Sequence, residues 1–592
     1  MKLSRLQELP TSREMIDVFG GYNHNLRIRE GEFYDMKNLS SADYPVLSPR
    51  QKRGIYATPD KPTGLLAKDA LCYVDGKNLV INEYPIDMGL LTDAEFCPKT
   101  LISMGAYIII MPDKKYINTT DYSDKGNIEA TYRSGGSTIF QMCKADGTDI
   151  NPKIGNTSPT GYVDGDYWLD TSKKPHVLKQ WSQTNSMWIS VTTTYVRIIF
   201  SGWLDLDFQV GDSITISGIT TEELTDFNKT MVIQDLGYTD SNDKYDRRRA
   251  YIVVTGTIDQ YYDITDQILV TRQMPEMDFV IESGNRLWGC RYGLDLYGNF
   301  VNEIYASKLG DFKNWNAFES ISTDSYVASL GADGQFTGAV THLGYPVFFR
   351  ENCMHKVYGN YPANYQVQTT TCRGVQKGCD KSIAIVNEVL YYKSRSAICA
   401  YDGSLPTEIS SALGDEVYSN AVAGSLGNKY YISMSDANNA WHLFVYDTNR
   451  GMWHREDNTQ VIEFCNCRGD LYFIDYADNQ IKTVRGTGVL ETSPISWEAV
   501  TGVIGTDSPD KKYISRLDVR MMLTVGTRVY IYIEYDSCGQ WEHTFTMTGT
   551  RLQSFAVPIR PRRCDHLRLK IIGAGEAKIY SICKTIEQGS DL

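Results

Sequence analysis

Histidine is scarce in this chain, and the short motifs of common enzyme classes are missing. Only 8 of the 592 residues are His, and they are isolated from one another. The sequence contains no GxSxG, HExxH, GxxxxGK[ST] or EF-hand pattern. We therefore expect a protein that is not an enzyme, with no catalytic residue, cofactor or metal. A glycosidase stays open as an alternative, because its two carboxylates need only lie about 5–10 Å apart in space.

Long apolar runs and paired cysteine motifs are also missing. The longest runs, such as Tyr107 to Met111, have the length of a strand, whereas a membrane helix needs about 20 residues. The N-terminus, MKLSRLQELPTSREMIDVFGG, lacks the apolar segment of a signal peptide. The 13 Cys form no CxxC pair, and Cys465 and Cys467 come closest. We expect no membrane span, buried free thiols, and folding in a reducing compartment.

An excess of positive charge is missing too, since the net charge is −13. A surface that grips nucleic acid is basic, so DNA binding is not expected, although DNA can pass an acidic wall without sticking. Three short basic patches occur within turn-like settings: Arg50–Arg53, Arg247–Arg249 and Arg560–Arg563. We interpret them as partners in ion pairs between subunits, with a ring of arginines facing DNA as the alternative.

Short alternating segments are what the sequence does contain. It has 40 Tyr, and polar turns rich in Gly, Asn and Asp separate the alternating runs, a pattern typical of β-strands. One unit of turn, strand, turn and strand recurs near Gly76, Gly105, Gly284, Gly344, Asn387, Gly427 and Gly469. Its spacing of about 40 residues from Gly344 onward is that of a four-stranded propeller blade. The pattern predicts an all-β fold with a β-propeller of about seven blades, within a range of six to eight.

A long gap interrupts this rhythm between Gly105 and Gly284. We expect an inserted β-barrel or sandwich module there, with a hairpin turn at Gly211-Asp212. Trp168, Trp181 and Trp188 within it are interpreted as its core, with a carbohydrate-stacking face as the alternative. The loop DLGYTDSNDKYD, with Asp235, Asp240, Asp243 and Asp246, is interpreted as a solvated turn, with calcium binding as the alternative.

The pattern changes again near residue 488, where about seven strands in some 100 residues indicate a β-sandwich. The first 55 residues contain few strong strands, so we expect an arm that adds a strand to a neighbouring subunit or closes the propeller. The predicted domains are an N-terminal arm at 1–55, a first propeller part at 56–128, the insert at 129–275, a second propeller part at 276–487, and the sandwich at 488–592.

The stretch EIYASKLGDFKNWNAF, residues 303–318, looks like either a ligand site or a turn. Gly310 gives the freedom for a tight turn, and Asp311 can bond to its own backbone. Trp315 is expected to fold back onto the blade. The segment is similar to the Asp-box turn of sialidase-like propellers, which has a structural role, so we interpret Gly310, Asp311 and Trp315 as a structural turn.

Two phrases resemble the tail hub, nozzle and DNA-stabilising proteins of tailed bacteriophages. The first contains Phe19-Gly20-Gly21, Asn38-Leu39, Pro45-Val46-Leu47, Arg50 and Arg53. The second contains Asn285-Arg286-Leu287-Trp288, then Ser307, Gly310-Asp311 and Trp315. The two phrases lie in the same order as in that family, around blade-like repeats.

This resemblance implies a structural part of a virion tail, assembled in the cytoplasm of the host bacterium. It implies a homo-oligomeric ring, most often a hexamer, that contacts portal-side adaptor proteins and tail fibre or tip proteins. Packaged DNA would be retained by the ring and pass along its axis without sequence-specific binding. The alternatives are a carbohydrate- or receptor-binding protein of the tail tip, which would use the Trp-rich insert, and a propeller glycoside hydrolase.

Overall fold

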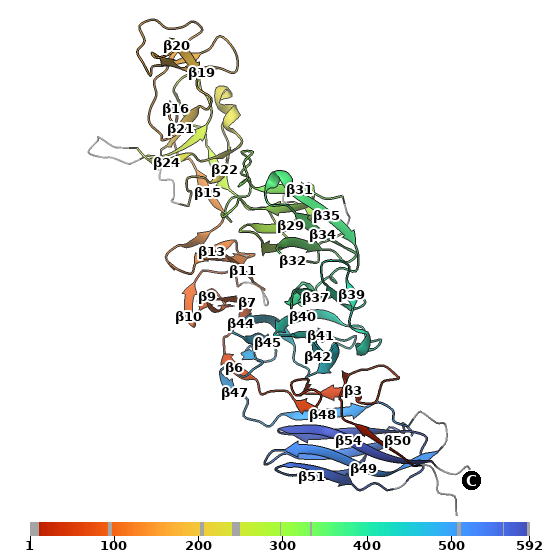
Figure 1. Cartoon of the computed structure of the whole chain (residues 1–592). Coiled ribbons are helices and arrows are strands. Elements are labelled where there is room, and N and C mark those ends of the chain that lie inside the picture. Colours follow the sequence, from red (N-terminus) through yellow and green to blue (C-terminus); the bar gives the residue numbers. More distant parts are fainter. Residues whose placement is uncertain are drawn as a thin grey trace, which may run out of the picture.

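The structure is a computed structural model that describes residues 11–92, 98–201, 207–239, 249–295, 298–331, 334–505, 511–560 and 562–588. Within these ranges the regular structure is β-strand apart from four short 3-10 helices, η1 (Glu222–Phe227), η2 (Pro362–Asn364), η3 (Asp380–Ser382) and η4 (Ser411–Leu413). The prediction of a β-rich fold is confirmed. Among the described helices, none has the length and apolar character needed to span a bilayer. The molecule is elongated, with three groups of strands along its length (Figure 1).

Seven antiparallel units of four strands form the middle of the molecule. They are β7–β10 (Pro62–Lys68, Ala70–Asp75, Asn78–Ile81, Tyr84–Asp87), β11–β14 (Thr100–Met104, Tyr107–Met111, Lys115–Asn118, Lys125–Asn127), β28–β31 (Phe279–Glu282, Leu287–Leu294, Phe300–Ala306, Tyr326–Ser329), β32–β35 (Gly338–His342, Tyr345–Phe349, Cys353–Tyr358, Gln366–Thr371), β36–β39 (Ala384–Val386, Val389–Lys393, Ile398–Tyr401, Thr407–Glu408), β40–β43 (Ser419–Leu426, Lys429–Ser435, Trp441–Asp447, Met452–Arg455), and β44–β46 (Val461–Cys467, Asp470–Asp475, Ile481–Thr483) with β6 (Gly54–Ala57). Their strands are joined mostly by tight turns. Asn82-Glu83 and Asn387-Glu388 have positive φ at both residues, which suits the right-handed twist of a two-residue hairpin.

These seven units contact one another in a closed cycle. The first strand of each packs against the next unit, in the order β7, β11, β28, β32, η3 with β36, β40 and β44, and β44 contacts β7 again. The arrangement is propeller-like. The last unit is completed by β6 from the N-terminal region, whose Gly54 lies opposite Thr483 of β46. Closing the cycle with a strand from the other end of the chain is one of the two roles expected for the N-terminal arm.

Residues 130–272 form a group of strands with its own core between the second and third units. Three sheets make it up, in the orders β15-β27-β22-β23, β24-β25-β21-β16-β26 and β17-β18-β19-β20. The bounds are β15 (Ala130–Arg133), β16 (Thr138–Cys143), β17 (Lys153–Gly155), β18 (Tyr167–Asp170), β19 (Val177–Ser182), β20 (Met187–Ser190), β21 (Tyr195–Phe200), β22 (Ser213–Ser217), β23 (Thr230–Val232), β24 (Asp235–Tyr238), β25 (Ala250–Thr255), β26 (Tyr262–Ile264) and β27 (Leu269–Arg272). Ala130 pairs with Arg272, so the chain enters and leaves this insert at neighbouring points.

The strands after residue 495 lie in two sheets at the opposite end of the molecule (Figure 1). One sheet has the order β1-β54-β49-β52, and the other ends with β48-β53-β50-β51. The bounds are β1 (Thr11–Ile16), β48 (Ser496–Thr501), β49 (Lys512–Leu523), β50 (Arg528–Tyr535), β51 (Glu542–Thr548), β52 (Leu552–Val557), β53 (Leu567–Ala574) and β54 (Ala577–Gln588). The short β47 (Val489–Leu490) precedes them and pairs with β6.

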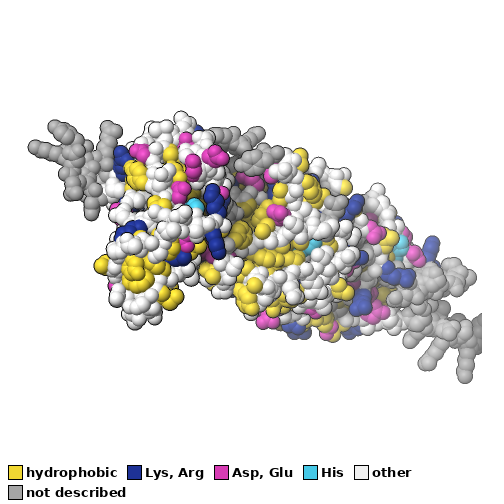
Figure 2. Space-filling view, turned by 90° about the horizontal axis from the view of Figure 1, so that it is seen from above, with side chains coloured by type: hydrophobic (Ala, Val, Ile, Leu, Met, Phe, Trp, Pro, Cys, Tyr) yellow, Lys and Arg dark blue, Asp and Glu magenta, His cyan; other side chains and the backbone are white. Residues whose placement is uncertain are grey.

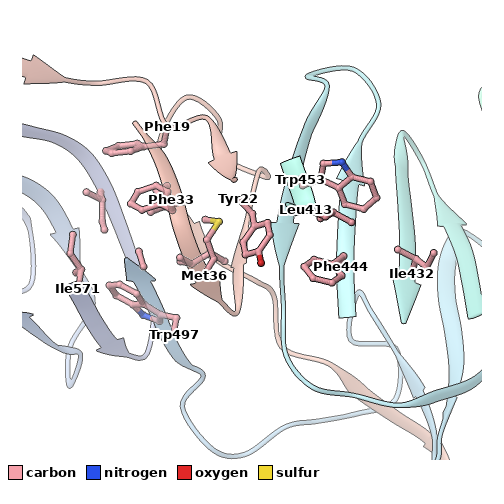
Figure 3. Close-up of a cluster of buried hydrophobic side chains, with 14 of the residues drawn as sticks. Phe19, Tyr22, Phe33, Met36, Leu413, Ile432, Phe444, Trp453, Trp497 and Ile571 are labelled. Atoms are coloured by element: carbon pink, nitrogen blue, oxygen red, sulfur yellow. The ribbon is translucent and has the colours of Figure 1, made fainter. Parts of the chain in front are cut away.

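N-terminal strands join this end to the ring of sheets. β2 (Gly21–Tyr22) pairs with β43, and β3 (Glu32–Lys37) pairs with β2 and β48, so one ten-stranded sheet runs from β40 to β51. The pair β4 (Leu39–Ser40) and β5 (Ser48–Pro49) follows. One continuous hydrophobic cluster crosses this joint (Figure 3), and it includes Phe19, Tyr22, Phe33, Met36, Phe444, Trp453, Trp497 and Ile571. The residues predicted as an arm therefore lie inside the body of the molecule.

Candidate functional site

The stretch around Gly310 forms a compact turn after β30. Gly310 has a φ of +75°, the left-handed conformation that favours glycine. The Asp311 carboxylate accepts the backbone N–H of Lys313 at 3.0 Å and a hydrogen bond from the Asn314 side chain. Trp315 is 4% exposed, and its Nε1 donates to the Phe312 carbonyl at 2.9 Å. The polar groups of this turn are thus directed at the chain itself.

Asn314 extends this turn into a contact with the insert. Its side chain is fully buried, and its Oδ1 accepts the backbone N–H of Ser213 at 2.6 Å. Its Nδ2 lies 3.4 Å from the Gly211 carbonyl oxygen and from Asp212 Oδ1. Gly211 and Asp212 therefore lie in a turn that precedes β22 and contacts Asn314. We had predicted a hairpin turn at this position. The segment that resembles a ligand site holds the insert on the ring.

A buried ion pair completes the same joint. Arg272 and Asp212 form an ion pair, with side chains 1% and 3% exposed. Arg272 Nε also donates to the Ile128 carbonyl at 2.9 Å, just before the chain enters the insert. A buried guanidinium needs all of these partners to offset its desolvation. Arg272 and Asn314 therefore make the main polar contacts between the insert and the ring. The sequence pointed to this role only through the position of Asn314 beside Trp315.

The three tryptophans of the insert lie together in the sheet β17–β20. Trp188 is the central ring, with its centroid 5.6 Å from Trp168 and 5.5 Å from Trp181 in edge-on contacts. Trp168 is buried, and Lys179 Nζ lies 4.6 Å above its ring. Trp181 and Trp188 are half-buried, and Tyr162 packs on both. The rings brace one another edge to face, an arrangement that stabilises a small sheet.

Exposed apolar side chains lie mostly on the other face of this sheet, since Met187 and Ile189 alternate with Trp188 along β20 and Ile154 lies opposite Leu169. Ile154, Val163, Met187 and Ile189 are 44–66% exposed. The view from above shows hydrophobic side chains gathered on the lobe that carries the insert (Figure 2). Trp181 and Trp188 thus brace the sheet on one face and stay partly accessible there.

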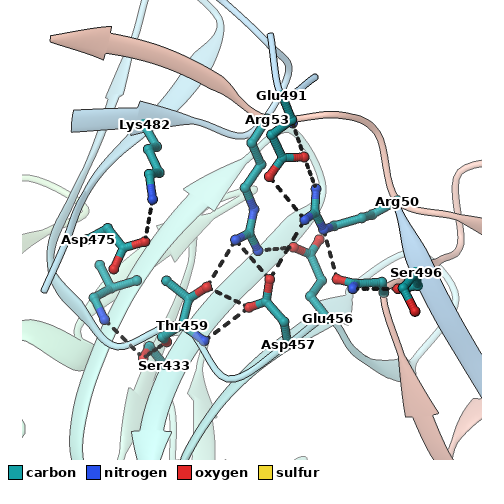
Figure 4. A network of polar contacts seen from close by, with 12 residues as sticks. Arg50, Arg53, Ser433, Glu456, Asp457, Thr459, Asp475, Lys482, Glu491 and Ser496 are labelled. Carbon is teal, nitrogen blue, oxygen red and sulfur yellow. Dashed lines mark hydrogen bonds and ion pairs between the residues drawn. The ribbon is translucent and has the colours of Figure 1, made fainter. Parts of the chain in front are cut away.

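The arginines of the first basic patch, Arg50 and Arg53, belong to a network of ion pairs and hydrogen bonds (Figure 4). Arg53 bonds to Glu456 at 2.8 Å and to Asp457 at 2.9 Å, and Arg50 bonds to Glu491 at 3.1 Å. Arg53 holds the pKa of Asp457 at about 2 despite burial, which alone would raise it. These ion pairs lie within one chain, whereas we had predicted pairs between subunits.

The other predicted groups are scattered. In the third patch Arg562 pairs with Glu542 at 3.1 Å. Of the second patch only Arg249 is described, and Asp240, Asp243 and Asp246 also lie outside the described residues; Asp235 accepts a hydrogen bond from Tyr251 at 3.2 Å. The described cysteines are free thiols and mostly buried. Across the described ranges, no three His, Cys, Asp or Glu side chains gather as metal ligands.

Comparison with known proteins gives no close relative. No family model and no curated protein matches this chain. Distant matches among solved structures include an exo-β-1,3-galactanase from Phanerochaete chrysosporium, with 8% identity, a TM-score of 0.21, and coverage of 52% of this chain and 94% of that one. An engineered GH43 glycoside hydrolase with endo-xylanase and exo-arabinofuranosidase activity has 10% identity, a TM-score of 0.19, and coverage of 52% and 96%. The extracellular domain of a putative hybrid two-component system from B. thetaiotaomicron has 8% identity, a TM-score of 0.18, and coverage of 93% and 99%. TM-scores this low carry no argument about function.

Proposed function

We propose that this chain is a structural component of a bacteriophage tail, in the hub or nozzle ring. Its body would be a seven-bladed β-propeller with an inserted β module and a C-terminal sandwich. The ring would form part of the DNA-ejection conduit and help to retain the packaged genome. The observation that carries this proposal is the position of the two phrases that resemble tail proteins: their residues lie at the joints between the groups of strands.

The N-terminal phrase supports the proposal at the joint between the ring and the C-terminal sheets. Gly21 has a φ of +84°, and a Cβ there would overlap the Trp453 carbonyl oxygen. Asn38 donates from its backbone to the Glu456 carbonyl and from its Nδ2 to the Ser496 carbonyl, at 2.5 and 2.8 Å. These contacts fix the strand order through which the modules become one body.

The second phrase supports it at the joint with the insert. Arg286 is 1% exposed and donates to the carbonyls of Ser307, Ser322 and Asp324. The Ser307 hydroxyl accepts the backbone N–H of Leu287 at 3.0 Å. These bonds hold the loop that presents Asn314 to the insert. The residues that carry the resemblance to tail proteins thus make the body rigid, which is what the wall of a conduit requires.

The mechanism in this proposal is mechanical. Copies of the chain form a ring, most often a hexamer in the resembling family, between portal-side adaptor proteins and fibre or tip proteins. The net charge of −13 suits a lumen through which DNA slides, because like charges keep phosphates from adhering.

Mass measurement and electron microscopy test this function. A hexamer of 66.9 kDa chains has a mass of about 400 kDa. We expect a particle several-fold heavier than one chain, with an axial hole in averaged images. Duplex DNA of random sequence should show no retention at physiological salt. A monomer at every concentration tested, or tight DNA binding, would contradict the proposal.

A second candidate function rests on the aromatic cluster of the insert. Half-buried Trp181 and Trp188, paired on one face of the sheet β17–β20, suit stacking against sugar rings, as in a receptor-binding protein of the tail tip. A glycan array probed with the full chain tests this candidate. Binding that disappears in Trp188→Ala and persists in Trp541→Ala, a change in the C-terminal sheets, would favour it.

A further inference from the structure

A cavity of about 220 Å³ lies where the N-terminal strands cross the last two units of the ring. Its wall comes from β4 and the segment leading to β6, from the β40–β41 turn, and from the residues after β46. The charged and aromatic residues of the wall are Arg50, Arg53, Lys429, Tyr431, Glu456 and Arg485. Four cations therefore face this cavity with one carboxylate, in a chain whose overall charge is strongly negative.

The four cations divide into two kinds. Arg50 and Arg53 are paired with carboxylates in the network of Figure 4. Lys429 Nζ has only the Ser40 hydroxyl, at 3.3 Å, and Arg485 has only the Gly469 carbonyl for its Nη1, at 3.2 Å. Within the described part of the chain, neither forms an ion pair at 4 Å or less, although Asp447 and Glu456 act on Lys429 from a greater distance and raise its pKa.

Tyr431 adds a hydroxyl donor to the same wall. The residue is 5% exposed and lines the cavity. Its hydroxyl can donate a hydrogen bond to an acceptor bound there. A hydroxyl, an ammonium and a guanidinium around one cavity are complementary to an oxyanion, which accepts from all three.

We propose that this cavity binds a small oxyanion of the phosphate class, either free phosphate or a phosphate monoester, through Lys429, Tyr431 and Arg485. Burial lowers the pKa of Lys429, and Arg485 lowers it further, while Asp447 and Glu456 raise it. An anion between Lys429 and Arg485 would relieve that repulsion. Because the wall includes residues of the N-terminal segment and of two units of the ring, a bound anion would also hold these elements together.

Isothermal titration of the full chain with inorganic phosphate, and separately with glycerol 3-phosphate, tests the proposal. We expect saturable binding to one site for at least one of them. Lys429→Met should weaken it about tenfold or more, since a charge-assisted bond is lost, and Tyr431→Phe should weaken it several-fold. Lys77→Met, an exposed lysine on the β8–β9 turn, is the matched control and should bind as the unchanged chain does. Binding by the ester alone would assign the site to an esterified ligand, and binding by both to the phosphate group itself.

Amine labelling gives a readout that does not depend on the variants. Trinitrobenzenesulfonate modification of Lys429, followed by peptide mass spectrometry, should slow several-fold when phosphate is added, while modification of Lys77 should not change. Equal affinity in Lys429→Met, or labelling of Lys429 that phosphate leaves unaltered, would overturn the proposal.

Discussion

His454 in β43 is a titratable group held neutral by the fold. It is 3% exposed, and burial lowers its pKa to about 3, with a further lowering by Lys429 that Asp447 partly opposes. Burial likewise lowers the pKa of His355, which is fully buried in β34, to about 4. An unfolded histidine titrates near pH 6.5, at about the reference value. Below that pH, these histidines bind protons in the unfolded chain but stay neutral in the folded chain. The two neutral histidines therefore favour the folded state at neutral pH, and this contribution to stability is lost as the pH falls.

Replacement of His454 should therefore flatten the pH dependence of stability. Between about pH 7 and pH 5, each such histidine contributes a slope of up to about 1.4 kcal/mol per pH unit below its unfolded pKa. We expect His454→Gln to remove the part of this slope that comes from one bound proton. Urea unfolding midpoints measured across that pH range give the slope. His543→Gln, at an exposed position of β51, is the matched surface control. An unchanged slope in His454→Gln would show that the folded chain protonates His454 at about the same pH as the unfolded chain does, contrary to the expectation.

Asn314 and Asn316 flank Trp315, and the sequence does not distinguish them. Only Asn314 is fully buried and bonded to the insert. Composition and periodicity predict that the stretch turns, because Gly310 and Asp311 have intrinsic turn preferences. They cannot predict its partner, since Ser213 lies about a hundred residues away and the contact depends on how two groups of strands dock.

Asn314→Ala should loosen the insert, whereas Asn316→Ala should not. The first change leaves the buried Ser213 N–H without an acceptor, at a cost of about 1–3 kcal/mol. We expect a lower thermal midpoint and faster proteolysis next to residues 128–130 and 272–279. If both variants melt and are cleaved like the unchanged chain, the turn does not hold the insert.

At the scale of elements, β6 closes the cycle of sheets by pairing with both β46 and β47. The sequence predicts that some strand must close a propeller, and the N-terminal region was one candidate. The pairing of β6 with β46 could not be predicted, because no pattern in Gly54–Ala57 identifies Ile481–Thr483 as its partner strand. Gly54 is the position where this strand packs most closely: an added Cβ would overlap the Thr487 carbonyl oxygen and lie 2.7 Å from Thr483 Oγ1.

Gly54→Ala should therefore weaken the closure. Overpacking of this kind costs about 1–3 kcal/mol, and hydrogen exchange should accelerate in β6, β46 and β47 before it does elsewhere. Gly135→Ala is the matched control, because a Cβ there meets nothing within 4 Å and its φ lies outside the left-handed region. Equal exchange in the two variants would mean that the cycle does not depend on this contact.

At the scale of the whole molecule, the four-stranded units were predictable and their connections were not. Short runs rich in aromatic and β-branched residues between polar turns, such as Tyr345–Phe349 and Val389–Lys393, predict strands. The break in rhythm between Gly105 and Gly284 likewise contains the strands β15–β27. The ten-stranded sheet was not predictable, because β2 and β3 are short and are placed by the cluster around Trp453 and Trp497.

The insert should be removable as a unit. Ala130 and Arg272 are antiparallel partners, so their Cα atoms lie about 5 Å apart and a short Gly linker can replace residues 130–272. The insert has its own hydrophobic cluster, centred on residues such as Phe140, Ile198 and Ile252. We expect both pieces to give β-type circular dichroism and cooperative melting. The body should melt at a lower midpoint because Asn314 loses its partners.

If the remaining body builds the proposed ring, the chain without the insert should still assemble, with the mass of each copy reduced by that of the insert. An insert that stays unfolded alone, while the full chain melts cooperatively, would instead make it an inseparable part of the body.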